Sequence, residues 1–365
     1  MTPALDVRGL RVDFGGSPVV DGVSLAIAPG ECVAIVGESG AGKSLTARAL
    51  LGLLPVDASV RTERMTVGGV DAAGLSERGW RALRGSRIAL VSQDALVSLD
   101  PLQRIGREVA EARRLHGMAA GRDDVQALLR RVWMPEPELR ARQYSHQLSG
   151  GLRQRALIAS ALSADPAVLV ADEPTTALDA TVQARVLALL REIADAGTAV
   201  LFISHDFAAV RRLADRVLVM RAGIVVEEGP VREVLENPQH EYTRQLIEAT
   251  QHSPRDVQAP VSDRVLVATG VSKSFGETAA VAEASFAVPK GRTLGIVGES
   301  GSGKTTLARM LVGVEQPDAG ELHWSGSPRV QLVHQNPLGA FDPRWTIGRS
   351  LREALAAGRV PRAKR

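Results

Sequence analysis

The sequence predicts an α/β fold in which helices cover an open parallel β-sheet, and three observations support this prediction. A glycine-rich loop stands between an apolar strand, "CVAIV", and a helix-forming run, "LTARALLGLL". Two further apolar runs, "AVLVADEP" and "TAVLFIS", have the length and composition of buried strands. Both end in polar residues, and the carboxyl ends of such strands are where open α/β sheets bind ligands.

Length and composition indicate a soluble protein of two domains. The chain has 365 residues, and single hydrophobic cores stop growing at about 250 to 300 residues. No apolar run approaches the roughly 20 residues that span a bilayer. The N-terminus lacks a basic head followed by an apolar run, and the single cysteine, Cys32, excludes an internal disulfide, so we expect a cytoplasmic protein. A net charge of +3 without a block of basic side chains indicates no nucleic-acid partner.

An internal repeat defines the predicted domains. The segment "IVGESGAGKS", residues 35–44, returns as "IVGESGSGKT", residues 296–305. The match continues downstream, where "LVSQDALVSLDPLQRIGREVAEA" resembles "LVHQNPLGAFDPRWTIGRSLREA". A polar stretch with two prolines separates the copies and is typical of a linker. We therefore predict a complete domain at 1–250, a linker at 251–263 and the first part of a second domain at 264–365.

The repeated segment fits the phosphate-binding pattern G-x-x-x-x-G-K-[ST]. Its glycines let backbone amides fold around phosphates, the helix N-terminus favours negative charge, and Lys43 supplies a cation. Ser44 is suited to bind Mg²⁺ through its hydroxyl. A glycine-rich turn would explain one match, but two matches with the same flanks favour phosphate binding. The assigned residues are Gly37, Glu38, Ser39, Gly40, Ala41, Gly42, Lys43 and Ser44, and in the second copy Gly298, Glu299, Ser300, Gly301, Ser302, Gly303, Lys304, Thr305 and Thr306.

Two carboxylates and a histidine follow the other apolar runs of the first domain. Asp172 suits the shell of a Mg²⁺ ion, and Glu173 suits a general base that polarises the water attacking a terminal phosphate. The alternative is a solvated strand end with two chance acids. His205 follows the next apolar run, where it could orient the phosphate and the water together. A lone histidine is more often structural, but its position after a strand favours the functional interpretation.

A third motif, "YSHQLSGGLRQR" at residues 144–155, places Ser149 at the N-cap of an amphipathic helix. Such a helix start offers free amides and a positive dipole to a phosphate, although an ordinary capped helix would need no function. With the phosphate loop, the carboxylate strand and the histidine in this order, residues 4–250 resemble an ATP-binding cassette (ABC) of transporters, whose signature reads LSGGQ. The start of the second copy resembles the same family.

The resemblance implies a P-loop ATPase core with an antiparallel β subdomain and a helical subdomain. It implies that ATP and Mg²⁺ bind, that Glu173 and His205 are catalytic, and that Phe14 and Phe275 stack on adenine. The other implied nucleotide contacts are Gln93, Ser149, Gly150, Gly151, Asp179 and Gln335. The implied Mg²⁺ ligands are Ser44, Gln93, Asp172, Thr305 and Gln335.

Several residues resemble the family branch that imports peptides and nickel. Leu152 stands where the general signature has glutamine, and "YSHQ" precedes the signature. "SLDP" after Gln93 and "GPVREVLENPQHEYTRQLIEA" near the end of the first domain resemble the same branch. The expected activity is therefore ATP hydrolysis coupled to import of peptides or a related solute such as nickel. The expected partners are integral membrane permease subunits and, through the complex, an extracytoplasmic solute-binding protein, with the chain peripheral on the inner face of the cell membrane.

In this family two cassettes face each other, and each ATP lies between the phosphate loop of one and the signature of the other. Residues 264–365 contain no signature, carboxylate strand or switch histidine. No complete site can form within the 365 residues, so we expect a second complete cassette, from another copy or another subunit, as a partner. The alternative function is a soluble tandem ABC ATPase that acts on ribosomes or nucleic acid, but such proteins have a long, charged linker.

The second copy is also expected to be less stable than the first. In the expected fold the strand before the phosphate loop has the carboxylate strand as its neighbour, and residues 264–365 do not encode that neighbour. An apolar strand with an unpaired edge is an aggregation hazard, and a core of about 100 residues without its centre is marginal. We therefore expect the second copy, including a strand at "TLGIV", to be mobile or to need covering by the first.

Overall fold

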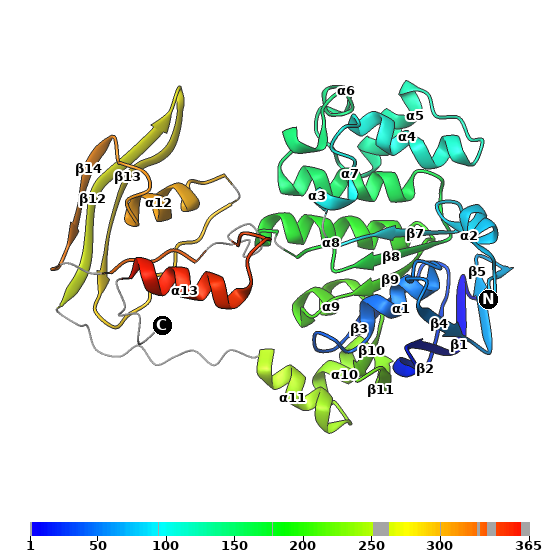
Figure 1. Ribbon diagram of the computed structural model, residues 1–365. Helices are drawn as coiled ribbons and strands as arrows, with labels where there is room; N and C mark the ends of the chain where they lie inside the picture. Colours follow the sequence, from blue (N-terminus) through cyan, green and yellow to red (C-terminus); the bar gives the residue numbers. More distant parts are fainter. Residues whose placement is uncertain are drawn as a thin grey trace. The chain divides into compact units, whose positions relative to one another are not determined.

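The computed structural model describes residues 2–93, 95–176, 178–250, 263–299, 301–326, 329–333 and 341–358 (Figure 1). The chain separates into two compact units, Met1–Arg255 and Asp256–Arg365. The linker predicted at 251–263 lies outside the described residues except for Asp263. Each unit is described by itself.

A six-stranded sheet forms the centre of the first unit, in the order β11-β10-β3-β9-β8-β7. Its strands are β3 (Cys32–Val36), β7 (Ile88–Val91), β8 (Val168–Asp172), β9 (Ala199–Ile203), β10 (Arg216–Arg221) and β11 (Ile224–Pro230). All neighbours pair in parallel except β10 and β11. This confirms the predicted α/β fold with its parallel sheet. The expectation that β3 pairs with the carboxylate strand β8 is wrong, because β9 lies between them.

Both faces of the central sheet are covered. All five residues of β3 are buried, with Cys32, Ala34 and Val36 in one hydrophobic cluster and Val33 and Ile35 in the other. This alternation follows from the twofold repeat of side chains along a strand. The helices α1 (Lys43–Leu50), α8 (Ala180–Asp195) and α9 (Phe207–Leu213) contribute to these clusters. Neither face of β3 is therefore exposed to solvent, which explains why its sequence is apolar throughout.

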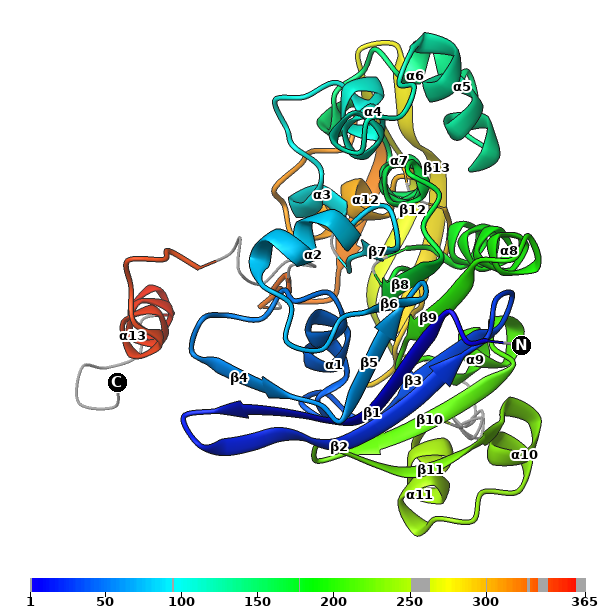
Figure 2. The same ribbon diagram turned by 90° about the vertical axis from the view of Figure 1, so that its right-hand side faces the viewer.

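An antiparallel sheet completes the second of these clusters (Figure 2). Its order is β2-β1-β5-β6, with β4 paired to β1. The strands are β1 (Leu5–Phe14), β2 (Ser17–Ile27), β4 (Ala58–Arg61), β5 (Arg64–Val67) and β6 (Val70–Asp71). The short helix α2 (Glu77–Leu83) follows β6 and buries Trp80 and Leu83 in the same cluster. The subdomain implied by the resemblance is thus present.

Helices gather beside β7, at one end of the central sheet (Figures 1 and 2). They are α3 (Ala95–Ser98), α4 (Ile105–Leu115), α5 (Arg122–Arg131), α6 (Pro137–Arg140), the 3₁₀ turn η1 (Ser145–Gln147) and α7 (Gly150–Leu162). At the other end of the unit, α10 (Val231–Glu236) and α11 (Glu241–Thr250) pack against the same hydrophobic cluster as α7. No helix among the described residues of the chain is long and apolar enough to cross a membrane.

The second unit is smaller and has a thin core. Its elements are β12 (Arg264–Phe275), β13 (Thr278–Pro289), α12 (Lys304–Leu311), β14 (Ala319–Trp324) and α13 (Ile347–Ala357). The three strands pair antiparallel in the order β13-β12-β14. The hydrophobic cluster of this unit buries Ala268, Val271, Leu307 and Met310 within the described residues. It therefore corresponds to β1, β2 and α1 of the first unit without the central sheet.

The predicted strand "TLGIV" at residues 293–297 does not form. These residues have no regular structure, and the side chain of Val297 is 94% exposed. In the first unit the corresponding strand β3 is hydrogen-bonded between β9 and β10, which come about 160 residues or more later in the chain. Among the described residues of the second unit, no strand corresponds to β9 or β10. Without a neighbouring strand on either side, an extended backbone gives residues 293–297 no stabilising hydrogen bonds.

Hydrogen exchange should separate the two copies of this segment. We expect the amides of residues 33–36 to exchange at least about 100-fold more slowly than those of residues 294–297, because only the first set is held in a buried ladder. Exchange measured by mass spectrometry on the intact chain makes each copy the control for the other. Equal protection of the two segments would contradict the structural difference.

Candidate nucleotide-binding site

The residues singled out in the first domain lie at one edge of the central sheet. The strands β3, β9, β8 and β7 are parallel neighbours, so their carboxyl ends share an edge. The phosphate loop follows β3, Asp172 ends β8, and His205 follows β9. Gln93 follows β7 and is exposed. A parallel sheet thus assembles residues that lie between 37 and 205 in the sequence.

The phosphate loop depends on glycine at two positions. A Cβ at Gly37, where φ is +152°, would stand 2.2 Å from the carbonyl oxygen of Met220 on β10. Gly42 is the N-cap of α1 with φ of 98°, a left-handed conformation that glycine adopts without strain. Lys43 Nζ donates to the carbonyl oxygens of Gly37 and Glu38, both at 2.8 Å. The loop therefore closes around its own lysine.

Ser44 and Asp172 form a pair of oxygen ligands beside the loop. The Ser44 hydroxyl donates to Asp172 Oδ1 at 3.0 Å. Burial raises the pKa of Asp172 above its usual value, although the Ser44 hydrogen bond acts in the opposite direction. Burial also lowers the pKa of Lys43, against the attraction of Glu173 and Asp172. A hydroxyl and a carboxylate side by side fit Mg²⁺, which is held by a few hard oxygen ligands together with substrate phosphates.

Glu173 and His205 meet at the same edge. His205 Nδ1 lies 3.2 Å from Glu173 Oε1, and the Thr176 hydroxyl donates to Glu173 Oε2 at 3.1 Å. Glu173 has φ of 48°, a left-handed conformation that costs a non-glycine residue free energy and concentrates at functional sites. Its N–H is held by the carbonyl oxygen of Ile203 at 3.0 Å. The direction of the Glu173 carboxylate is thus set by its backbone conformation, the Thr176 hydroxyl and the His205 imidazole.

The signature and Asp179 lie at the starts of two neighbouring helices. Ser149 is the N-cap of α7 and accepts from the Leu152 N–H at 3.4 Å, as its sequence position predicted. Asp179 is the N-cap of α8 and accepts from the Val182 N–H at 2.9 Å. A Cβ at Gly151 would meet Val182 Cγ1 at 2.6 Å, so the two helix starts pack closely. Within the described residues, no hydrogen bond joins Ser149 to the phosphate loop of its own unit.

The aromatic residues assigned to adenine differ in burial. Phe14 ends β1 and packs partly against the cluster under the antiparallel sheet. Phe275 ends β12, is 51% exposed, and has Lys273 Nζ at 5.8 Å from the centre of its ring. The contacts of these two rings among the described residues do not test adenine binding, so stacking of Phe14 and Phe275 on adenine stays a prediction.

The second phosphate loop repeats the lysine contacts of the first. Lys304 Nζ donates to the carbonyl oxygens of Gly298 at 2.8 Å and Glu299 at 2.6 Å. However, Lys304 is only half-buried and Gly298, Glu299 and Gly301 of its loop are exposed, whereas only 6% of Lys43 is accessible. Ser300 and Gln335, also assigned to this site, lie outside the described residues. The local loop is thus similar in the two units, and its surroundings are not.

Sequence reasoning missed one residue at the first loop, Tyr242 of α11. Its Oη accepts from the Glu38 N–H at 3.2 Å across 204 positions of the chain. In the sequence, the segment "NPQHEYTRQL" indicates only a family branch. The one available signal was a tyrosine in a chain that has two tyrosines, which is too weak to indicate a contact with the loop.

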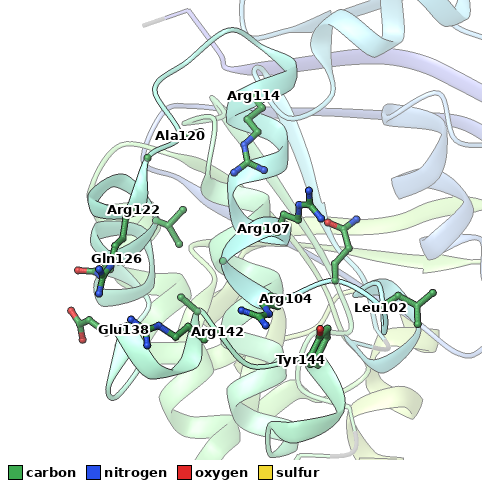
Figure 3. A pocket seen from close by; sticks show the side chains of 15 residues that line it. Leu102, Arg104, Arg107, Arg114, Ala120, Arg122, Gln126, Glu138, Arg142 and Tyr144 are labelled. Atoms are coloured by element: carbon green, nitrogen blue, oxygen red, sulfur yellow. The ribbon is translucent and has the colours of Figure 1, made fainter.

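A basic pocket of about 510 Å³ opens among the helices beside β7 (Figure 3). Its charged lining residues are Arg104, Arg107, Arg114, Arg122, Arg142 and Glu138. Glu138 is bound by Arg130 at 2.6 Å, and no carboxylate of the described residues lies within 4.0 Å of the five arginines. The pocket therefore carries an uncompensated positive charge.

Comparison with known proteins gives consistent matches. A family model for the ABC transporter matches residues 20–176 and 281–344, which include both phosphate loops. The chain is 41% identical to the peptidoglycan transport ATP-binding protein YejF of Agrobacterium fabrum (strain C58 / ATCC 33970), over 97% of this chain and 71% of that protein. It is 36% identical to the glutathione import ATP-binding protein GsiA of Escherichia coli (strain K12), over 92% of this chain and 64% of that protein. The chain thus spans 71% and 64% of the lengths of these two relatives.

Solved structures share the fold of the first unit. CbiO1 of Clostridium perfringens, part of the ABC transporter complex cbiONQ, is 28% identical with a TM-score of 0.56, over 65% of this chain and 92% of that chain. A dimeric post-hydrolysis state of the ATP-binding cassette MJ0796, bound to ADP and Pi, is 25% identical with a TM-score of 0.55, over 62% of this chain and 99% of that chain. From its sequence, its fold and the edge that carries its polar residues, the chain belongs to the ABC transporter family.

Proposed function

We propose that the chain binds and hydrolyses ATP to energise a membrane importer of peptides or a related solute. The observation that carries the proposal is the meeting of the Ser44–Asp172 pair and the Glu173–His205 pair at the edge that holds the phosphate loop. Phosphoryl transfer needs positioned charge around the phosphates and a group that orients the attacking water. Each pair supplies one of these requirements.

The first pair, with the loop, binds the phosphates. The loop amides and Lys43 Nζ attract their negative charge, and the burial of Lys43 strengthens that attraction by excluding water. Ser44 and Asp172 would hold Mg²⁺, which neutralises charge on the phosphate oxygens when it is bound. Gln93, Thr305 and Gln335 are proposed as further ligands from the family resemblance.

The second pair acts on water. Glu173 accepts the proton of the attacking water, and His205, hydrogen-bonded to Oε1, fixes the direction of the carboxylate. The Thr176 hydroxyl occupies the other oxygen, Oε2, so that the carboxylate cannot rotate freely. The left-handed backbone conformation of Glu173 keeps its carboxylate in this direction.

The solute class rests on relatives and on sequence. The two relatives are named for peptidoglycan transport and glutathione import, and both solutes contain peptide. The branch markers around Leu152 favour the same class. The soluble alternative, action on ribosomes or nucleic acid, has only the tandem arrangement in its favour. We therefore propose a peptide-type importer, with an extracytoplasmic solute-binding protein in the complex.

The basic pocket is proposed to face the membrane subunits. Its lining begins at Leu102, nine positions after Gln93, and by family resemblance Gln93 lies at the junction with those subunits. Five arginines without carboxylate partners favour an acidic segment, because a charge-assisted bond from arginine to carboxylate is stronger than a neutral one. This surface would attach the chain to the inner face of the membrane.

Removing the carboxylate of Glu173 should separate binding from hydrolysis. In Glu173→Gln we expect ATP hydrolysis to fall at least about 100-fold, because the amide cannot accept the proton of the water. Binding of ATP should persist, measured by equilibrium titration with a fluorescent analogue. Glu192→Gln, an exposed change on α8, serves as the control. Turnover near that of the unchanged chain would remove Glu173 from its assigned role.

Turnover should depend on the meeting of two cassettes. Residues 1–365 contain one signature and one carboxylate strand, so within them the site on Lys43 lacks a second signature and the site on Lys304 lacks a catalytic glutamate. We therefore expect the specific rate of ATP hydrolysis to rise with protein concentration, or to appear only when a second complete cassette is added. The measurement is initial rate against concentration, with association followed by light scattering. A constant specific rate in a dilute monomer would show that one chain suffices.

Charge reversal in the basic pocket should weaken attachment to the membrane subunits. We expect Arg114→Glu with Arg142→Glu to lose copurification with an integral membrane protein while ATP binding is kept, because an acidic segment would meet like charge. Arg81→Glu with Arg232→Glu changes the same charge on exposed residues outside the pocket and is the control. Copurification of the unchanged chain with RNA, and with no membrane protein, would favour the soluble alternative instead.

A further inference from the structure

The peptide group between Gly37 and Glu38 is bound at both of its polar atoms. Its carbonyl oxygen, from Gly37, accepts from Lys43 Nζ at 2.8 Å. Its N–H, from Glu38, donates to Tyr242 Oη at 3.2 Å. Because a peptide group is planar and trans, the carbonyl and the N–H point in opposite directions. A rotation of this group would therefore break the lysine contact and the tyrosine contact together.

Tyr242 is itself firmly held. The residue is 4% exposed, and the guanidinium of Arg221 lies 4.8 Å from the centre of its ring. Its N–H donates to His240 Nδ1 at 3.1 Å. Glu227 on β11 accepts from the N–H of Gln239 at 2.8 Å and of His240 at 3.0 Å. The hydroxyl is thus fixed by the sheet, through contacts independent of the phosphate loop.

We infer that Tyr242 is a positioning residue of the phosphate loop, which fixes the Gly37–Glu38 peptide group and through it the position of Lys43. The inference rests on the proposed nucleotide site. It assigns α11, near the end of the first unit, a part in nucleotide binding that the phosphate-loop motif does not contain. Tyr242 acts through the backbone and touches no phosphate.

The second loop has the lysine contacts without the tyrosine contact. Lys304 binds the carbonyl of Gly298, but among the described residues none accepts from the Glu299 N–H. The lysine contact alone therefore forms from local sequence. What Tyr242 adds in the first unit is a restraint on the opposite side of the peptide group, which keeps the loop in one arrangement before the nucleotide arrives.

The test removes one oxygen atom. Tyr242→Phe keeps the ring under Arg221 and deletes the acceptor for the Glu38 N–H. It is made in a Lys304→Ala background, so that titration with a fluorescent ATP analogue reports on the first loop. We expect the dissociation constant and the KM for ATP to rise about threefold to tenfold, as for the loss of one hydrogen bond, with kcat changed less than about twofold.

A direct measurement accompanies the titration. Amide exchange at Glu38 should become faster in Tyr242→Phe, while exchange in β3 and the melting temperature stay as in the background chain. Ser86→Ala, which also deletes a hydroxyl but just after the end of α2, should alter none of these. Unchanged affinity and unchanged exchange at Glu38 would overturn the inference, and so would tighter binding. Loss of exchange protection throughout the first unit would mean a role in folding alone and would also overturn it.

Failure of the proposed function gives a different result. Lys43→Ala in the same background should abolish binding of the analogue, since it deletes the cation of the loop. If the background chain itself fails to bind ATP, the proposed function is wrong and the titration cannot bear on Tyr242. Exchange at Glu38 still tests the hydrogen bond in that case, because it needs no nucleotide.

Discussion

The candidate site depends on the double pairing of β3. This strand is hydrogen-bonded to β9 on one side and to β10 on the other, and all of its residues are buried. It delivers the phosphate loop to the sheet edge that also receives the carboxylates from β8. The close approach of Gly37 to Met220 of β10 shows how tightly the loop is seated. If β3 were displaced, Lys43 would lose the buried surroundings that strengthen its attraction for phosphate.

The charged side chains at this edge of the sheet carry both signs. Lys43 is buried near Asp172 and Glu173, which favour its charged form, and Ser44 binds Asp172 directly. The two carboxylates differ in restraint, since one bonds a hydroxyl of the loop and the other is aimed by Thr176 and His205. A nucleotide adds negative charge where two carboxylates already lie, and the proposed metal cation would offset that charge together with Lys43. That role favours Mg²⁺ independently of the sequence motif.

Much of the first site could be predicted from sequence because its parts are local. The loop needs consecutive residues, and β3, β8 and β9 are continuous apolar runs. The order of the strands could not be predicted, because the composition of an apolar run does not indicate which strand lies beside it. The prediction placed β8 beside β3, where the structure has β9. The contact of Glu38 with Tyr242 was missed for a related reason. It depends on how α11 packs 204 residues later, which no local pattern encodes. The strand at 293–297 was predicted wrongly because its composition suits a ladder for which the described part of the second unit offers no partner strand.

The two phosphate loops separate what a motif encodes from what a fold adds. Both lysines bind the two carbonyl oxygens at the start of their own loop, at 2.6 to 2.8 Å. These contacts form even where the preceding segment has no strand, so they follow from the loop sequence. Burial does not follow from it, because Lys304 is half-buried in a loop whose Gly298 and Gly301 are exposed, whereas Lys43 is buried. In water the attraction between a lysine and a phosphate is screened, whereas exclusion of water strengthens it. An exposed loop therefore offers the nucleotide shape with less electrostatic gain, so the sheet, more than the motif, favours the first loop as the stronger of the two proposed sites.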